Sequence, residues 1–141
     1  MPNSKPFSAS LLVCQTVILE KTGGSSAIRI MDVLTIGRLS PIAEFTVFTY
    51  LHSNPGDIVF HTLKLQMVAR NGEDWVIVAD APENIFVFGY LVDPSGPGGY
   101  TLTTQFILNP HVMGPLGLYF IQALLDGELL TQTPLMLKWR S

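Results

Sequence analysis

The end of the chain constrains the fold most, because it reads as two alternating segments joined by a tight turn. Between Leu118 and Leu125 one parity is entirely apolar: Tyr119, Ile121, Ala123 and Leu125. Beyond Asp126-Gly127 a second apolar set alternates with longer side chains: Leu135, Leu137 and Trp139 against Met136, Lys138 and Arg140. A half-buried strand has this period of two, and Asp-Gly accepts the positive φ of a two-residue turn. The sequence therefore predicts an antiparallel hairpin.

Similar runs fill the rest of the chain and are separated by turn residues. The nine strand-like runs are Ser10–Glu20, Ile28–Leu39, Phe45–Leu51, Thr62–Met67, Trp75–Ala79, Ile85–Val92, Tyr100–Leu108 and the two of the final hairpin. Asn71-Gly72 predicts a second hairpin turn. Short connections favour antiparallel neighbours, since parallel strands need long crossovers. We therefore expect one domain over residues 1–141, an all-β antiparallel sandwich with residues 1–8 as a flexible arm.

Little helix is expected, because no segment shows sustained apolar spacing of three and four residues between helix caps. The loops that contain Pro41, Pro82 or Pro110 offer room for a single turn each.

Composition restricts the classes of partner. Apolar residues make up 48% of the chain and charged residues only 13%, so an isolated sandwich would leave apolar surface uncovered. We expect a second copy of the chain to cover it, most simply as a dimer. A net charge of −3 without a basic run argues against nucleic acid, and no apolar stretch is long enough for membrane insertion. No secretory signal is recognisable, which predicts a cytoplasmic protein.

Titratable side chains are scattered and suggest no reactive cluster. Cys14, the only cysteine, rules out an internal disulfide and stands among apolar neighbours, where a thiol stays inert. His52 precedes the predicted turn at residues 54–57 and Asp57 ends it, so the two could lie within reach of each other but would need a third group to act together. His61 shares the parity of Leu63, which predicts a buried, hydrogen-bonded ring.

The remaining candidates are equally isolated. His111 stands alone in a proline-containing loop, and Asp32 shares the parity of Ile28, Ile30 and Leu34, which predicts an inward carboxylate with a polar partner. We expect no catalytic residue, no cofactor and no metal site, and hence no enzyme.

One pattern resembles the end of immunoglobulin-like sandwiches: a Gly117-x-Tyr119 strand start, the Asp126-Gly127 turn and the exit at Pro134-Leu135. In those domains a tyrosine often hydrogen-bonds a neighbouring corner while its ring packs between the sheets, and Tyr119 is the candidate. The resemblance concerns architecture and carries no function with it.

Over nearly the whole chain the sequence is also similar to a family of small bacterial proteins of unknown function. The motifs that carry this resemblance are Leu11-Leu12-Val13-Cys14, Val17, Glu20, Thr22-Gly23, Ile28–Val33, Pro41, Gly117-x-Tyr119, Asp126-Gly127 and Pro134-Leu135. No motif aligns between Trp75 and Asn109. The resemblance implies an immunoglobulin-like sandwich in a bacterial protein, with no catalytic residues to transfer.

The favoured function is a non-enzymatic structural or interaction module that self-associates. A predicted strand that is apolar on both faces is the candidate contact surface, together with two aromatic residues of the next predicted strand. The residues are Ile85, Phe86, Val87, Phe88, Tyr90 and Leu91, with Tyr100 and Phe106. One alternative is a carrier that holds a small apolar ligand in a cavity between the sheets. The other is a structural component of a phage or secretion apparatus.

Overall fold

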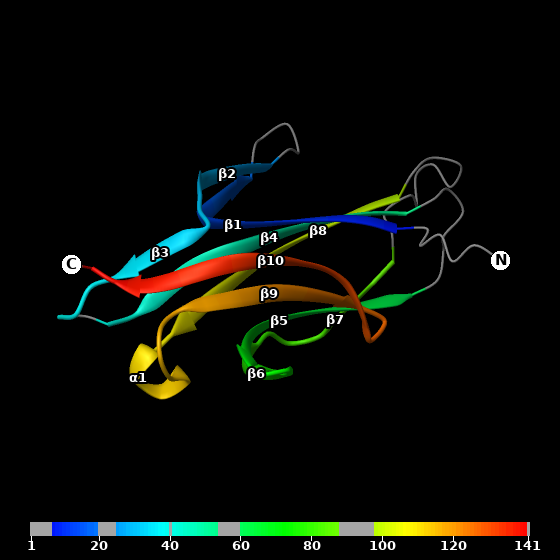
Figure 1. Cartoon of the computed structure of the whole chain (residues 1–141). Helices are drawn as coiled ribbons and strands as arrows, with labels where there is room; N and C mark the ends of the chain where they lie inside the picture. Colours follow the sequence, from blue (N-terminus) through cyan, green and yellow to red (C-terminus); the bar gives the residue numbers. More distant parts are fainter. Residues whose placement is uncertain (1–6, 20–24, 40, 54–59, 88–97, 141) are drawn as a thin grey trace.

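The structure, a computed structural model, describes residues 7–19, 25–39, 41–53, 60–87 and 98–140. Within these ranges the chain forms ten strands and one four-residue helix, which confirms the all-β prediction (Figure 1). The elements are β1 (Phe7–Leu19), β2 (Ser25–Ile30), β3 (Val33–Ile36), β4 (Ala43–Ser53), β5 (His61–Asn71), β6 (Asp74–Asp80), β7 (Asn84–Phe86), β8 (Gly98–Leu108), α1 (Pro110–Met113), β9 (Leu118–Leu125) and β10 (Glu128–Trp139).

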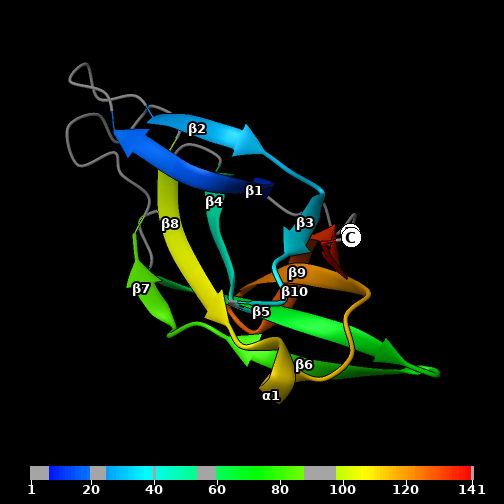
Figure 2. The same cartoon turned by 90° about the vertical axis from the view of Figure 1, so that its left-hand side faces the viewer.

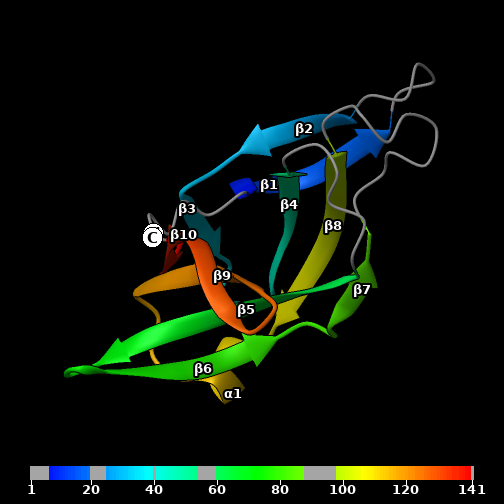
Figure 3. The same cartoon turned by 90° about the vertical axis from the view of Figure 1, so that its right-hand side faces the viewer.

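The strands form two sheets. The first sheet has the order β2-β1-β4-β8, and the second has the order β3-β10-β9-β5-β6, with β7 also pairing with β5. The strand pairs are antiparallel except for β3 and β10, which run parallel. Figures 2 and 3 show the two sheets on opposite sides of the molecule.

Both sheets contribute to one core. From the first sheet come the fully buried side chains of Phe45, Val47 and Leu51, which alternate along β4. Alternate residues of β5, β9 and β10 face them: Leu63, Leu65, Met67, Ile121, Ala123, Leu135 and Leu137. Because strand side chains alternate between faces, the remaining residues of these strands lie on the outer face of the second sheet.

The final hairpin has the predicted geometry. Asp126 and Gly127 have φ values of 52° and 84°, the positive values that a type I′ turn requires at both positions. Tyr119 lies opposite Leu135 in the register. The β5–β6 hairpin also forms, with Gly72 at a φ of 66° and Asn71 opposite Asp74.

The predicted run Ile28–Leu39 divides into two strands that belong to different sheets. The Met31 N–H donates to the Val13 carbonyl in the first sheet, whereas the Asp32 carbonyl accepts from the Met136 N–H in the second. Because the chain passes from one sheet to the other here, the alternation of side chains between the two faces starts anew. The face on which Asp32 lies therefore does not follow from that of Ile30. Asp32 is exposed, and the prediction of an inward carboxylate is wrong.

Two smaller expectations concern the loops and the start of the chain. The helical turn expected near Pro110 is α1, and the Asn109 side chain caps it by accepting from the His111 N–H. Strand β1 begins at Phe7 and pairs with the end of β4, so Phe7 and Ser8 belong to a strand rather than to the expected arm. In the described ranges no helix has the length and apolarity needed to cross a membrane.

Candidate interaction surface

The residues predicted for self-association do not form one exposed surface. Phe86 and Phe106 are buried in the core, so the expectation that Phe106 is an exposed aromatic residue is wrong. Phe106 stacks on Phe45 with ring centroids 5.3 Å apart, because β8 turns this parity toward the core. Phe86 stacks at 4.0 Å on the half-buried Tyr100, where β7 and β8 approach each other.

The other members of that set are divided. Ile85 is 72% exposed and Val87 is half-buried. Phe88, Tyr90 and Leu91 lie outside the described residues. Burial of the Phe86 and Phe106 rings therefore removes two members of the predicted surface.

The histidines do not gather into a reactive site. His52 is exposed, with its Nε2 atom 2.7 Å from the Tyr50 hydroxyl, and Asp57 lies outside the described residues. His111 is exposed, with its ring 6.1 Å from that of Trp139. The described part of the chain contains no group of three or more His, Cys, Asp or Glu residues that could hold a metal ion. Cys14 is buried, and burial raises the pKa of its thiol.

His61 is buried as predicted, and its partner is the carboxylate of the final turn. The His61 Nδ1 atom lies 2.7 Å from Asp126 Oδ2, and the Thr62 N–H donates to Asp126 Oδ1 at 2.9 Å. Burial raises the pKa of the Asp126 carboxyl, but the hydrogen bonds from His61 and the Thr62 N–H and the charge of His61 outweigh this, so that the pKa lies below its usual value. This contact fastens the β9–β10 turn to the start of β5.

The outer face of the second sheet, hereafter the outer face, carries the largest set of exposed apolar side chains that the strand register brings together. Residues opposite one another on neighbouring strands share a face, so the register arranges this set in rows across the sheet. The outer-face residues are Val33, Lys64, Gln66, Val68, Arg70, Trp75, Ile77, Asp80, Leu118, Phe120, Gln122, Leu124, Leu129, Gln132, Pro134 and Met136.

Two rows at one end of this face are predominantly apolar. The Leu118 row consists of Val33, Met136 and Leu118, continued by Arg70 and Trp75 on β5 and β6. The Phe120 row consists of Pro134, Phe120, Val68 and Ile77. The large apolar side chains at the margins of these rows are between 37% exposed, for Met136, and 55% exposed, for Ile77. Monomeric proteins rarely leave such a contiguous apolar area in water.

The centre of the apolar rows is tightly packed. The Trp75 ring meets the Phe120 ring edge-on at 5.3 Å, and the Arg70 guanidinium lies 5.4 Å from the Trp75 ring. Val68 is only 1% exposed although its side chain points away from the inter-sheet core. This order gives the face a defined shape for a partner to fit against.

The next row is a ladder of glutamines. Gln66 Nε2 donates to Gln122 Oε1 at 2.8 Å, and Gln122 Nε2 donates to Gln132 Oε1 at 3.0 Å. Gln122 is buried and stands on β9, the central strand of the sheet order β3-β10-β9-β5-β6. Beyond it lies the Leu124 row, formed by Leu129, Leu124 and Lys64.

Few charges interrupt this surface. Lys64 Nζ lies 3.2 Å from Asp80 Oδ2, and both side chains stay partly exposed. Arg70 is held by its Nε–H, which donates to the Gly72 carbonyl at 3.1 Å. Depletion of charge at the centre of a patch, with charged side chains toward its margins, is typical of protein interfaces.

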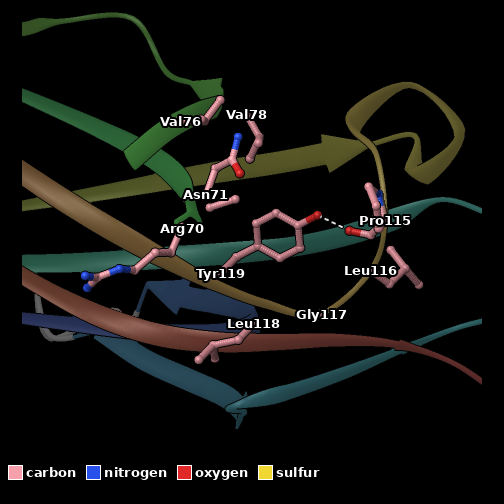
Figure 4. Close-up of a pocket in the computed structure, with 10 residues that line it drawn as sticks. Arg70, Asn71, Val76, Val78, Pro115, Leu116, Gly117, Leu118 and Tyr119 are labelled. Atoms are coloured by element: carbon pink, nitrogen blue, oxygen red, sulfur yellow. Dashed lines mark hydrogen bonds between the residues drawn. The ribbon is translucent and has the colours of Figure 1, made fainter. Parts of the chain in front are cut away.

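A groove of about 390 Å³ opens beside the Leu118 row, between the β5–β6 hairpin and residues 115–118 (Figure 4). Its lining includes the apolar side chains of Val76, Val78 and Leu116. In Figure 4 the Tyr119 hydroxyl donates to the Pro115 carbonyl at the wall of the groove, and the Arg70 side chain points away from it.

The sequence reasoning missed the outer face, although a signal was present. In Leu118–Leu125 the parity opposite the core also carries Leu118, Phe120 and Leu124, and Trp75–Ala79 is apolar on both parities. A strand that is apolar on both sides indicates either full burial or a partner.

Comparison with known proteins gives no family. No protein-family model and no curated protein matches the chain. Among solved structures, the alkylpurine DNA glycosylase AlkC of Pseudomonas fluorescens, bound to DNA containing an abasic site analog, is similar over 91% of this chain, at a TM-score of 0.47 and 8% identity. The chain spans about 30% of that protein's length. A similarity at this level carries no functional conclusion.

Proposed function

We propose that this chain is a non-enzymatic interaction module that self-associates through the outer face. The observation that supports it is the pair of adjoining rows, the Leu118 row and the Phe120 row, whose large apolar side chains at the margins stay exposed on an ordered sheet. Burying these side chains against a second copy removes apolar surface from water, which is the main favourable term in association.

The size of the face reaches the minimum for a specific interface. Sixteen outer-face positions, about 4.8 Å apart between strands and about 6.8 Å apart between rows, cover about 520 Å², so two copies would bury about 1,000 Å². The side chains that project from the sheet add to this area. A dimer is therefore the simplest product.

A charged substitution at the margin of the face tests the proposal. Ile77 is exposed on the edge strand β6, so Ile77→Glu should leave the fold intact and raise the dimer dissociation constant at least about 30-fold, or about 2 kcal/mol. Ile107→Glu is the matched control, because Ile107 is 63% exposed on β8, the edge strand of the first sheet.

Sedimentation equilibrium at micromolar protein provides the measurement. The wild type and Ile107→Glu should be dimeric, and Ile77→Glu should be monomeric with an unchanged circular dichroism spectrum. A wild type that stays monomeric at these concentrations contradicts self-association, and equal dissociation by both substitutions contradicts the choice of face.

We further propose that the fold is an immunoglobulin-like sandwich. The order β1-β4-β8 facing β10-β9-β5 corresponds to the strands A, B and E facing G, F and C of such domains. The Tyr119 hydroxyl donates to the Pro115 carbonyl, four residues upstream and just before β9, as in the tyrosine corner of these sandwiches. A crystal structure with a different strand order would contradict this assignment.

A carrier of a small apolar ligand is the second candidate, favoured by the groove near Val76, Val78 and Leu116. Its volume of about 390 Å³ falls in the range of small-molecule sites. Native mass spectrometry of protein purified from its source should then show a retained apolar ligand, and an empty chain speaks against this role. A component of a phage or secretion apparatus would instead require open assemblies, which electron microscopy of concentrated protein would show.

A further inference from the structure

We infer that the two copies are related by a two-fold axis parallel to β9, so that the glutamine ladders of both copies join into one closed ring of hydrogen bonds. This inference rests on the proposed self-association through the outer face and specifies its geometry. A face-to-face pair has its two-fold axis in the plane of the interface, because only such a rotation turns one face toward the other. When the two sheets pack with their strands aligned, the axis runs either along the strands or across them.

The order of the rows favours an axis along the strands. That axis places each row on its own counterpart, so that the Leu118 and Phe120 rows cover each other and glutamine meets glutamine. An axis across the strands through Gln122 would place the Leu118 row on the region beyond Leu124, where Thr62 and the β9–β10 turn lie. Moving that axis to Phe120 would place the Leu118 row on the glutamines. Both positions cover apolar side chains with polar ones, and an axis between the Leu118 and Phe120 rows would leave the glutamines outside the interface.

The polarity of the ladder favours the same axis independently. Within one copy the side-chain hydrogen bonds are donated from Gln66 to Gln122 and from Gln122 to Gln132. At the two ends of the ladder, the acceptor Gln66 Oε1 and the donor Gln132 Nε2 therefore make no hydrogen bond to another described residue of the ladder. A rotation about β9 exchanges the two sides of the sheet and brings the β5 end of one ladder over the β10 end of the other. The open acceptor then meets an open donor, twice by symmetry. Reversing all the amide groups would reverse the ladder and preserve this match.

An axis across the strands would have the opposite result. It keeps β5 over β5 and β10 over β10, so open acceptor would meet open acceptor and donor would meet donor. Buried polar groups without partners cost free energy, so this arrangement is disfavoured. The geometry therefore predicts that residue 66 of one copy faces residue 132 of the other.

Four double variants test this pairing. Gln66→Lys with Gln132→Glu, and Gln66→Glu with Gln132→Lys, place opposite charges across the interface if the axis follows β9. Gln66→Lys with Gln132→Lys, and Gln66→Glu with Gln132→Glu, place like charges there. Within one copy the two positions are two strands apart, about 10 Å, so their mutual effect is small in water.

Sedimentation equilibrium in low salt should show dimer dissociation constants at least tenfold lower for the opposite-charge pairs than for the like-charge pairs, with the same circular dichroism spectrum for all four. Because one like-charge variant carries two lysines and the other two glutamates, a higher dissociation constant for both cannot be due to the net charge of the chain. If the wild type dimerises and Ile77→Glu dissociates it, yet all four variants weaken the dimer equally, the axis is wrong and self-association stands. A monomeric wild type overturns the proposed function itself.

Discussion

The contact between Asp126 and β5 should contribute measurably to stability, and replacing its carboxylate isolates that contribution. Asp126→Asn keeps the size of the side chain and suits the position, because asparagine tolerates the left-handed backbone with a φ of 52°. The substitution removes the negative charge that accepts hydrogen bonds from His61 and from the Thr62 N–H.

The magnitude follows from these two bonds. A hydrogen bond to a charged group contributes about 1.5–3 kcal/mol, roughly twice the contribution of a neutral one. Asparagine retains one carbonyl oxygen, so one neutral bond remains. The Asp126 side chain is 48% exposed, which screens the ionic part. We therefore expect a loss of about 1–2 kcal/mol at pH 7, or about 3–6 °C in the melting temperature for a domain of this size.

The effect should depend on pH in a defined direction. The pKa of Asp126 is lowered in the folded state, so between the folded and unfolded pKa values the unfolded chain binds more protons. Its contribution is fully present above the unfolded pKa, near 4, and is lost as the pH falls through the folded pKa. The difference between wild type and Asp126→Asn should shrink toward zero over that window.

Urea unfolding monitored by circular dichroism, at one protein concentration and at several pH values from 7 down to 3, measures this difference. Asp80→Asn is the control, because its pair with Lys64 is partly exposed and should contribute less than about 0.5 kcal/mol. If Asp126→Asn is as stable as the wild type at pH 7, or if its deficit is the same at pH 3, the reasoning is refuted.

Three further substitutions probe the core and the hydrogen bond of Tyr119 to Pro115. Tyr119→Phe removes the hydroxyl that donates to the Pro115 carbonyl, and should lower the free energy of unfolding by about 0.5–1.5 kcal/mol. Thr49→Val should raise it by about 1 kcal/mol in the same urea assay, because no described residue accepts from or donates to the buried Thr49 hydroxyl; a loss instead would reveal a partner. Ile121→Ala opens a cavity at a fully buried position and should cost about 2–5 kcal/mol, so a cost below 1 kcal/mol would place Ile121 outside the core.

Local sequence patterns did not reveal the candidate surface. Residues 85–91 are apolar on both faces of the predicted strand, and which of these faces lies inward depends on the strand that packs against it. Stacking of Phe86 on Tyr100 settled that question for β7. The outer face itself is assembled from β3, β5, β6, β9 and β10, strands from distant parts of the sequence.

The sequence by itself determined what depends on neighbouring residues: the all-β character, the Asp126-Gly127 hairpin, the burial of His61 and the room for a helical turn near Pro110. Period-two alternation and positive-φ turn residues are local signals, and the tertiary fold did not override them. Only the tertiary structure decided that residues 28–39 divide between two sheets and that β3 runs parallel to β10. It alone assembled the glutamine ladder, because pairing between strands far apart in the chain depends on the packing of whole sheets.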